Sequence, residues 1–161
     1  DLYEITQEMA ERAGCPAYEI SNHARGREHE SRHNRIYWAS GDWAGVGPGA
    51  HGRLTADGAR LATEAAERPG DYLKLLADGG AGIASEEELG PLAQARERIA
   101  MGLRVVEGLA TGDIEELGFA IDAARIAEFA ELGLFTLANG RVALTVKGRL
   151  AADRVAAEIA P

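Results

Sequence analysis

The chain has 161 residues, of which 46% are hydrophobic, and a formal net charge of −9. This length suits one domain or two small ones, and the charge argues against generic nucleic-acid binding. No apolar run approaches the roughly 20 residues of a membrane helix, and no signal peptide opens the chain, so we expect no integral membrane segment and a cytoplasmic location.

The N-terminal residues are predicted to form a helix, a strand and a long loop. Apolar residues recur at helical spacing from Leu2 to Met9, and Gly14 ends that helix. Residues 16–20 follow as a strand. Residues 21–36 are too polar for a core element and are predicted to be a loop, a kind of segment that is often functional.

The next segment is predicted to hold a hairpin and a short helix. Asp57-Gly58 is a strong turn signal and lies in the middle of a predicted hairpin over 51–63. A short helix over 71–77 follows. The glycines at 79–82 are the best candidate boundary between two modules.

The second module is predicted to be mostly helical and winged-helix-like. In chain order it holds a helix over 86–106 with a capping-box start at Ser85 or, as the alternative, a start at Pro91. Helices over 111–117 and 121–132, a hairpin over 134–144 around Asn139-Gly140 and a last helix from Leu150 follow. Its eight basic residues against thirteen acidic ones disfavour DNA binding, because phosphate contacts need lysine and arginine.

The run from Tyr18 to Gly52 gathers most of the chemically active side chains. It holds all four histidines and both tryptophans of the chain, with four arginines and a glycine-rich stretch. Ligand-binding loops on a rigid scaffold have this composition. A basic patch in an acidic protein suits an anionic small ligand better than a polymer.

The motifs of this run resemble a known family. YEISN at 18–22, SRHNRIYW at 31–38 and GVGPGAHG at 45–52 are similar to the HemW branch of the radical-SAM coproporphyrinogen III oxidase-like proteins. MGLR at 101–104 and LTVKGRL at 144–150 agree with that family, so the resemblance spans nearly the whole chain.

The resemblance implies an α+β fold with two domains. Residues 1–82 would be the C-terminal remnant of a radical-SAM (β/α) partial barrel with a ligand loop over 21–52, and residues 83–161 a winged-helix-like domain of the HemN C-terminal type. The full-length parent would bind a [4Fe–4S] cluster and S-adenosylmethionine (SAM). Cys15 is the single cysteine, and one thiolate cannot hold such a cluster, so we expect a fragment that lacks the N-terminal half of the barrel.

The resemblance also implies a porphyrin site. His33 is the candidate axial ligand of heme iron, because neutral imidazole binds that metal well. The other candidate heme or porphyrin contacts are Arg32, Asn34, Tyr37 and Trp38. The alternative for His33 is a loop anchor hydrogen-bonded to backbone. A zinc site with His29, four residues earlier, is disfavoured because no further ligand pattern accompanies the pair.

A second candidate set would face SAM in the barrel. It comprises Glu19, Asn22, Gly45, Gly47, Gly49 and His51. Glycines allow close approach of backbone to a ligand, but a tight turn at the barrel rim is the alternative. Two interpretations of Glu19 stay open: a carboxylate that faces the pocket, and a structural carboxylate that holds the loop by hydrogen bonds.

Three functions remain open at this point. Heme binding and delivery by a chaperone is favoured by the HNRIYW motif. The alternatives are oxidative decarboxylation of coproporphyrinogen III, and a lid or interaction domain without activity of its own. A fragment of a barrel would expose apolar surface, so self-association is also expected.

Overall fold

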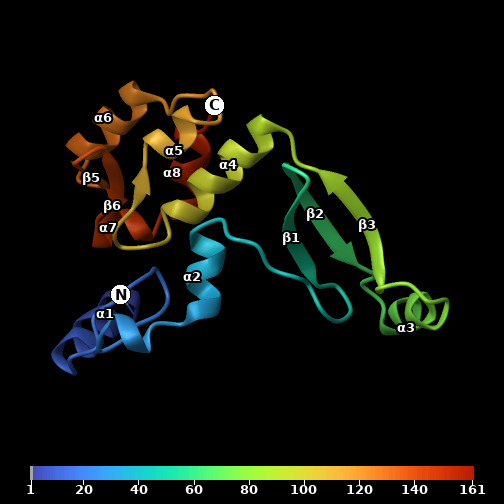
Figure 1. Cartoon of the computed structure of the whole chain (residues 1–161). Helices are drawn as coiled ribbons and strands as arrows, with labels where there is room; N and C mark the ends of the chain where they lie inside the picture. The colour runs from blue at the N-terminus through green and yellow to red at the C-terminus, as the bar shows by residue number, and fades with distance from the viewer. Residues whose placement is uncertain (1) are drawn as a thin grey trace. The chain divides into compact units, whose positions relative to one another are not determined.

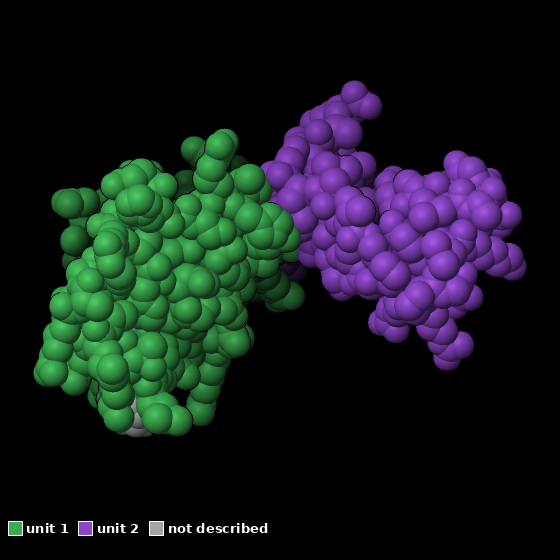
Figure 2. All heavy atoms as spheres, turned by 90° about the horizontal axis from the view of Figure 1, so that it is seen from below, with its two compact units in different colours: residues 1–40, 95–161 green, residues 41–94 purple. Residues whose placement is uncertain are grey.

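The computed structural model describes residues 2–161. They form two compact units, one of residues up to 40 together with 95–161, and one of residues 41–94 (Figure 2). Helices and antiparallel sheets occur in both units, which confirms the predicted α+β class. The predicted boundary between 82 and 83 differs from this division, because it lies inside the second unit.

The first unit begins with α1 (Leu2–Arg12), which confirms the first predicted helix. Gly14 follows with a φ of +73°, a conformation that glycine adopts without cost. The predicted strand over 16–20 is reduced to isolated bridges within a looped segment.

The prediction of a continuous loop over 21–36 is wrong. A short 3-10 helix, η1 (Arg27–His29), and a helix, α2 (Arg32–Trp38), lie within or across that range. The predicted ligand loop 21–52 is therefore not one loop, and its residues divide between the two units at Ser40.

The C-terminal part of the first unit contains the predicted helices and hairpin in the predicted order, together with a two-residue strand and a four-residue helix that were not predicted (Figure 1). Its elements are α4 (Pro91–Gly102), β4 (Leu109–Ala110), α5 (Gly112–Glu115), α6 (Ala123–Glu131), β5 (Phe135–Ala138), β6 (Arg141–Leu144), α7 (Val146–Arg149) and α8 (Ala152–Ile159). The strands form an antiparallel sheet in the order β4-β6-β5. Asn139 and Gly140 take positive φ values in the β5–β6 turn, which confirms that hairpin.

The core of the first unit lies between these helices and this sheet. Ile99 of α4, Ile114 of α5 and Ile159 of α8 are fully buried, and Val142 of β6 nearly so. Phe129 and Phe135 pack with ring centroids 6.0 Å apart. This continuous apolar cluster supports the elements that carry the site described below.

The second unit is a three-stranded sheet with one helix. Its elements are β1 (His51–Ala56), β2 (Ala59–Ala65), α3 (Pro69–Ala77) and β3 (Ile83–Glu88), and the antiparallel strand order is β1-β2-β3. Asp57 and Gly58 take φ values of +51° and +82° in the β1–β2 turn, so the first predicted hairpin is also confirmed.

Of the two predicted starts of the long helix, Glu86 is wrong and Pro91 is confirmed. Residues 83–88 form β3, where Thr63 lies opposite Glu86 and Leu61 lies opposite Glu88. The helix begins only at Pro91, a residue that is well tolerated in the first turn. Pairing with β2 therefore overrides the helical tendency of three consecutive glutamates.

Within residues 2–161, no helix combines the length and the apolar character needed to cross a membrane.

Candidate functional site

The HNRIYW motif lies on a capped helix. The Ser31 hydroxyl accepts a hydrogen bond from the backbone N–H of Asn34 at 3.3 Å, which satisfies a free donor at the start of α2. After Trp38 the chain leaves the helix, and Ser40 has a φ of +52°. Side chains four residues apart in the motif therefore share a face of α2.

The segment before α2 pairs with the segment after α4. The backbone N–H of Ile20 donates to the carbonyl of Arg104 at 3.0 Å, and that of Val106 donates to the carbonyl of Tyr18 at 3.2 Å. Glu19 bridges Val105 between them. These contacts join the N-terminal segment of the first unit to its C-terminal domain.

Glu19 is a fully buried carboxylate held inside its own loop. It accepts hydrogen bonds from the backbone N–H of Ser21 at 3.3 Å, from the Ser21 hydroxyl and from the side-chain amide of Asn22. Local acceptors of this kind fix turns. The contacts support the structural alternative for Glu19, and a SAM-facing role for Glu19 and Asn22 stays a prediction.

Arg35 attaches α2 to the C-terminal domain. Its Nε donates to Glu30 at 2.5 Å, and its two terminal nitrogens donate to the two oxygens of Glu107 at 3.1 and 3.0 Å. Its guanidinium also lies 5.3 Å from the ring centre of Tyr18, whose hydroxyl accepts from the backbone N–H of Ser31. One side chain therefore fixes the orientation of the helix.

The electrostatics of this cluster follow from the hydrogen bonds. Those to Glu30 and then Glu107 raise the pKa of Arg35. Partial burial favours a higher pKa for Glu107, but hydrogen bonds from Arg35 and from backbone outweigh it, so the pKa of Glu107 is lowered. Both groups are held in their charged forms.

His33 lies on the outer face of α2. Its side chain is exposed, and its ring packs edge-on against Tyr37, with centroids 4.3 Å apart and planes at 67°. Tyr37 also lies 6.3 Å from Trp38. Among residues 2–161, neither imidazole nitrogen of His33 has a hydrogen-bond partner, which argues against the loop-anchor alternative.

Trp38 is half-buried beside the C-terminal domain. The guanidinium of Arg104 lies 5.4 Å from its ring centre, and Arg104 pairs with Asp153 at 2.6 Å. The indole Nε1 is buried, and no residue of 2–161 accepts its hydrogen bond. The predicted aromatic pair is therefore split, with Tyr37 beside His33 and Trp38 packed inward.

A cavity of about 1010 Å³ lies on the other side of α2. Arg32 and Trp38 line it, whereas His33, Asn34 and Tyr37 do not. Its charged lining is Arg27, Glu30, Arg32, Arg35, Arg98, Glu107, Asp113 and Arg141. The predicted porphyrin contacts are thus distributed over two faces of one helix.

Sequence reasoning missed the cavity residues of the C-terminal domain. Arg98 is in α4, Glu107 precedes β4 and Arg141 begins β6. Each is an isolated charge in an ordinary amphipathic or turn context, so no local pattern marks it. The arginine concentration at 23–35 was the available signal, because such a patch needs counter-charges elsewhere in the fold.

The glycine-rich segment and His51 lie in the second unit. A Cβ on Gly45 would overlap the carbonyl of His51, and the N–H groups of Gly47 and Gly49 donate to Tyr72 and to the carbonyl of Ala66. These contacts are those of a tight turn, which was the alternative to a ligand-facing loop.

His51 is exposed and begins β1. Its Nδ1 lies 3.5 Å from Glu64 on the neighbouring strand, and its carbonyl accepts from Trp43. Gly45, Gly47, Gly49 and His51 belong to the second unit, whereas Glu19 and Asn22 belong to the first, and the SAM-side set as a whole stays a prediction.

No group of three metal-binding side chains occurs in the described part of the chain, residues 2–161. His29 is in η1, exposed, with Nε2 3.6 Å from Glu28. His23 is paired through its backbone with Ala17. Cys15 is a free, half-buried thiol. These positions give no support to a zinc site.

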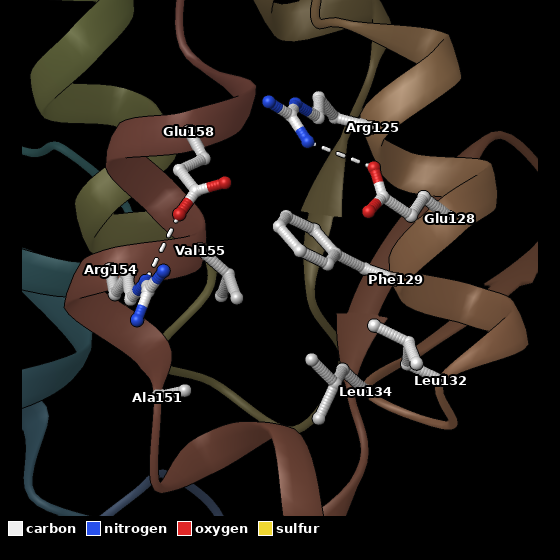
Figure 3. Close-up of a pocket in the computed structure, with 9 residues that line it drawn as sticks. All are labelled: Arg125, Glu128, Phe129, Leu132, Leu134, Ala151, Arg154, Val155 and Glu158. Carbon is white, nitrogen blue, oxygen red and sulfur yellow. Dashed lines mark hydrogen bonds and ion pairs between the residues drawn. The ribbon is translucent and has the colours of Figure 1, made fainter.

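A second cavity, of about 840 Å³, lies between α6 and α8 (Figure 3). Phe129, Leu134 and Val155 form its apolar wall, while Arg125–Glu128 and Arg154–Glu158 ion pairs stand on the two helices that flank it. It contains none of the residues predicted to bind a ligand.

A family model described as the HemN C-terminal domain matches residues 89–151, which run from just before α4 to just after α7. The Mycobacterium tuberculosis protein named heme chaperone HemW is 35% identical over 153 residues, which are 95% of this chain and 37% of that protein. The Bacillus subtilis protein of the same name is 31% identical over 159 residues, or 96% of this chain and 41% of that protein.

A Bos taurus protein named radical S-adenosyl methionine domain-containing protein 1, mitochondrial, is 36% identical over 68% of this chain and 25% of its own length. This chain therefore spans less than half the length of the relatives that it matches.

Among solved structures, coproporphyrinogen III oxidase (HemN) from Escherichia coli, a radical SAM enzyme, has a similar fold. The TM-score is 0.55 at 17% identity, over 92% of this chain and 32% of that one. At this identity the likeness shows the fold alone. The family model and the relatives confirm the predicted resemblance: the chain is similar to proteins named heme chaperone HemW over nearly its whole length, and to the HemN C-terminal domain over residues 89–151.

Proposed function

We propose that this chain is part of a heme chaperone and binds heme on α2, with His33 as an axial ligand of the iron. The observation that carries the proposal is the exposed imidazole of His33, which has no hydrogen-bond partner among residues 2–161 and rests on Tyr37. The relatives that cover 95% or more of this chain are named heme chaperone HemW, which supports delivery of heme as the role.

The chemistry suits transient binding of heme as cargo. A neutral imidazole offers a lone pair to the iron, and the edge-on Tyr37 ring holds it outward. Arg32 and Asn34 are the nearest polar side chains in sequence. The hydrogen bonds of Arg35 to Glu30 and Glu107 hold α2 in place, so the face that carries His33 is preorganised before heme arrives.

The finer parts of the fold and the cofactors belong to the same proposal. We take residues 83–161 as winged-helix-like and the N-terminal part as a barrel remnant, in line with the fold shared with HemN. A relative carries radical S-adenosyl methionine in its name, so the longer protein would bind SAM and a [4Fe–4S] cluster. Cys15 is the one thiol here, so cluster ligands would come from outside this sequence.

There are two alternatives to the proposed chaperone function. Oxidative decarboxylation of coproporphyrinogen III is the named activity of the HemN structure, but that likeness carries fold only. A lid or interaction domain would need no ligand on α2. Neither alternative requires an exposed histidine on this helix, whereas iron ligation does.

The test is a heme titration of this chain followed by absorbance, with His33→Ala and His29→Ala variants in parallel. His29 is an exposed histidine four residues earlier, so its replacement controls for loss of a surface imidazole. We expect saturable binding with a Soret shift in the parent and in His29→Ala, and loss of that shift in His33→Ala. Equal spectra for all three proteins would remove His33 from the site, and no binding at all would favour the lid reading.

A further inference from the structure

The three-stranded sheet of the second unit has two edges that differ in their hydrogen bonding. β1 forms one edge and β3 forms the other (Figure 1). In an antiparallel ladder, alternate residues of an edge strand direct both their N–H and their C=O groups away from the sheet. An edge strand whose outward groups have no partner can therefore pair with another strand.

The edge at β1 is closed by the segment that precedes this strand. The N–H of Arg53 donates to the carbonyl of Trp43 at 2.8 Å, and the carbonyl of Arg53 accepts from the N–H of Trp43 at 2.7 Å. The next outward N–H, that of Thr55, donates to the carboxylate of Asp42 at 3.0 Å. The outward donors of β1 at positions 53 and 55 are therefore satisfied within the unit.

The edge at β3 is open. The N–H of Leu89 donates to the carbonyl of Arg60 at 2.7 Å, so position 89 faces β2. Because alternate residues share a direction, Glu87 also faces β2, whereas Glu86 and Glu88 direct their main-chain groups outward. Among residues 2–161, no group donates to or accepts from these outward groups, and all six residues of β3 are exposed.

The side chains of the open edge determine which kind of strand can join it. Glu86, Glu87 and Glu88 are consecutive in β3, and none has an ion pair or a hydrogen bond with the rest of the described chain, residues 2–161. Residues 41–94 as a whole hold nine acidic and four basic side chains. Like charges on neighbouring strands are destabilising and opposite charges are stabilising. A second copy of β3 is thus disfavoured at this edge, and an extended segment with lysine or arginine is favoured.

We propose that β3 accepts an extended, basic segment of a partner protein as a fourth strand of this sheet. The main-chain groups of Glu86 and Glu88 supply the hydrogen bonds, and the row of carboxylates selects basic side chains on the incoming strand. The proposal is independent of heme binding on α2, because every residue that it uses lies in the second unit. Exposed charges are screened by salt, so we expect transient binding that weakens as ionic strength rises.

The first test is amide hydrogen exchange by NMR, residue by residue, with a peptide of alternating lysine and valine about eight residues long. Without peptide, the amide of Glu87 should exchange slowly because it faces β2, and those of Glu86 and Glu88 should exchange fast. Saturating peptide should slow exchange at Glu86 and Glu88 by at least about tenfold, because their N–H groups become hydrogen-bonded.

Two variants at one position separate the charge from the main chain. Glu86→Gln removes a charge and keeps the N–H, so peptide affinity should fall about two- to fivefold. Glu86→Pro also removes the outward N–H and should weaken binding by at least about tenfold. Proline is tolerated where an edge N–H faces solvent, and circular dichroism verifies that the sheet persists. Glu67→Gln is the matched control, an exposed glutamate of the same unit outside the strands, and should leave affinity unchanged.

Modified peptides make the same separation from the other side. N-methylation at alternate positions keeps every charge but removes the donors of one peptide edge, and should weaken binding at least about tenfold. Glutamate in place of lysine should abolish binding.

Four outcomes would overturn the proposal. They are equal affinity of the methylated and unmethylated peptides, equal affinity of Glu86→Pro and the parent chain, and peptide that leaves exchange at Glu86 and Glu88 unchanged. The fourth is slow exchange at these two amides that increases with protein concentration in the absence of peptide, which would assign the edge to a second copy of the chain.

Discussion

The two units of this chain are stabilised in different ways. The first unit buries large side chains such as Ile99, Leu103 and Ile114, each with at most 1% of its surface exposed. In the described residues 41–94, the buried side chains other than glycine are small: Thr63, Ala65 and Ala66. Every residue of β3 is exposed.

The second unit therefore depends on backbone pairing and surface contacts. Its β1–β2 ladder runs without interruption from His51 opposite Glu64 to Ala56 opposite Ala59. Asp42 accepts hydrogen bonds from Thr55 and from Arg60, and Arg60 also donates to the carbonyl of Gly41 at 2.8 Å. Hydrophobic burial thus supports the unit that carries α2, whereas hydrogen bonds support the unit that carries the glycine turn.

Truncation of a core side chain should show most clearly that the two units are stabilised differently. Ile99→Ala removes fully buried methyl groups and should destabilise the first unit by about 2–5 kcal/mol. Leu73→Ala in α3 removes a side chain that is 63% exposed and should change stability by less than about 0.5 kcal/mol. Urea unfolding followed by circular dichroism measures both, and similar effects would contradict the comparison.

The second prediction concerns α1, which belongs to the first unit but contributes nothing to its core. Leu2, Ile5 and Met9 lie on one face with 84%, 51% and 65% exposure, so self-association through this face is expected. Ile5→Glu should move the association midpoint to roughly tenfold higher protein concentration, because burial of one aliphatic side chain contributes about 1.5 kcal/mol.

Light scattering over a range of protein concentrations measures this association. Gln7→Glu adds the same charge off the apolar face and should leave the midpoint in place. A monomer at every concentration, with or without the Ile5 change, would contradict the expectation.

The smallest expected effect is the acid sensitivity of the Arg35–Glu107 pair. The pKa of Glu107 is lowered from its ordinary value of 4.5, so the pair stabilises the fold above that pH and loses this contribution as the pH falls through the lower folded-state pKa. Because the Glu107 side chain is 45% exposed, solvent screening limits the effect to about 0.5 kcal/mol.

Glu107→Gln tests this assignment. The variant should lose stability at pH 7 and show less further loss between pH 5 and pH 3 than the parent. Glu87→Gln on the exposed β3 strand is the control in the other unit and should not alter the pH profile. An identical profile for all three proteins would show that the pair does not couple folding to protonation.

Features with local causes were predictable from the sequence. Both hairpins follow from Asp57-Gly58 and Asn139-Gly140, whose positive φ values need only the residues of the turn. The first helix and its end at Gly14 follow from local periodicity in the same way.

Features with distant causes were not predictable. α2 is seven residues long, and its position depends on Glu107, which is 72 residues away from Arg35. A helix this short is marginal without tertiary contacts. β3 is a strand because β2 pairs with it, although Glu86 to Glu88 favour a helix.

The candidate site shows the same limit. The motif marked His33, Tyr37 and Trp38 as a group, and the fold then divides them between an open face and a cavity wall. That division depends on which side of α2 meets the C-terminal domain, which the spacing of the motif alone does not specify.

The pairing of Tyr18–Ile20 with Arg104–Val106 has a consequence for the order of synthesis. A ribosome that has completed α2 must still produce all of residues 41–94 and then α4 before the partner of Ile20 exists. The second unit has its contacts within one continuous stretch and is able to assemble while the chain is still growing. The helix α2 is thus made before its partners in the C-terminal domain and is secured only after they emerge, so the proposed binding of heme on α2 would have to wait for that domain.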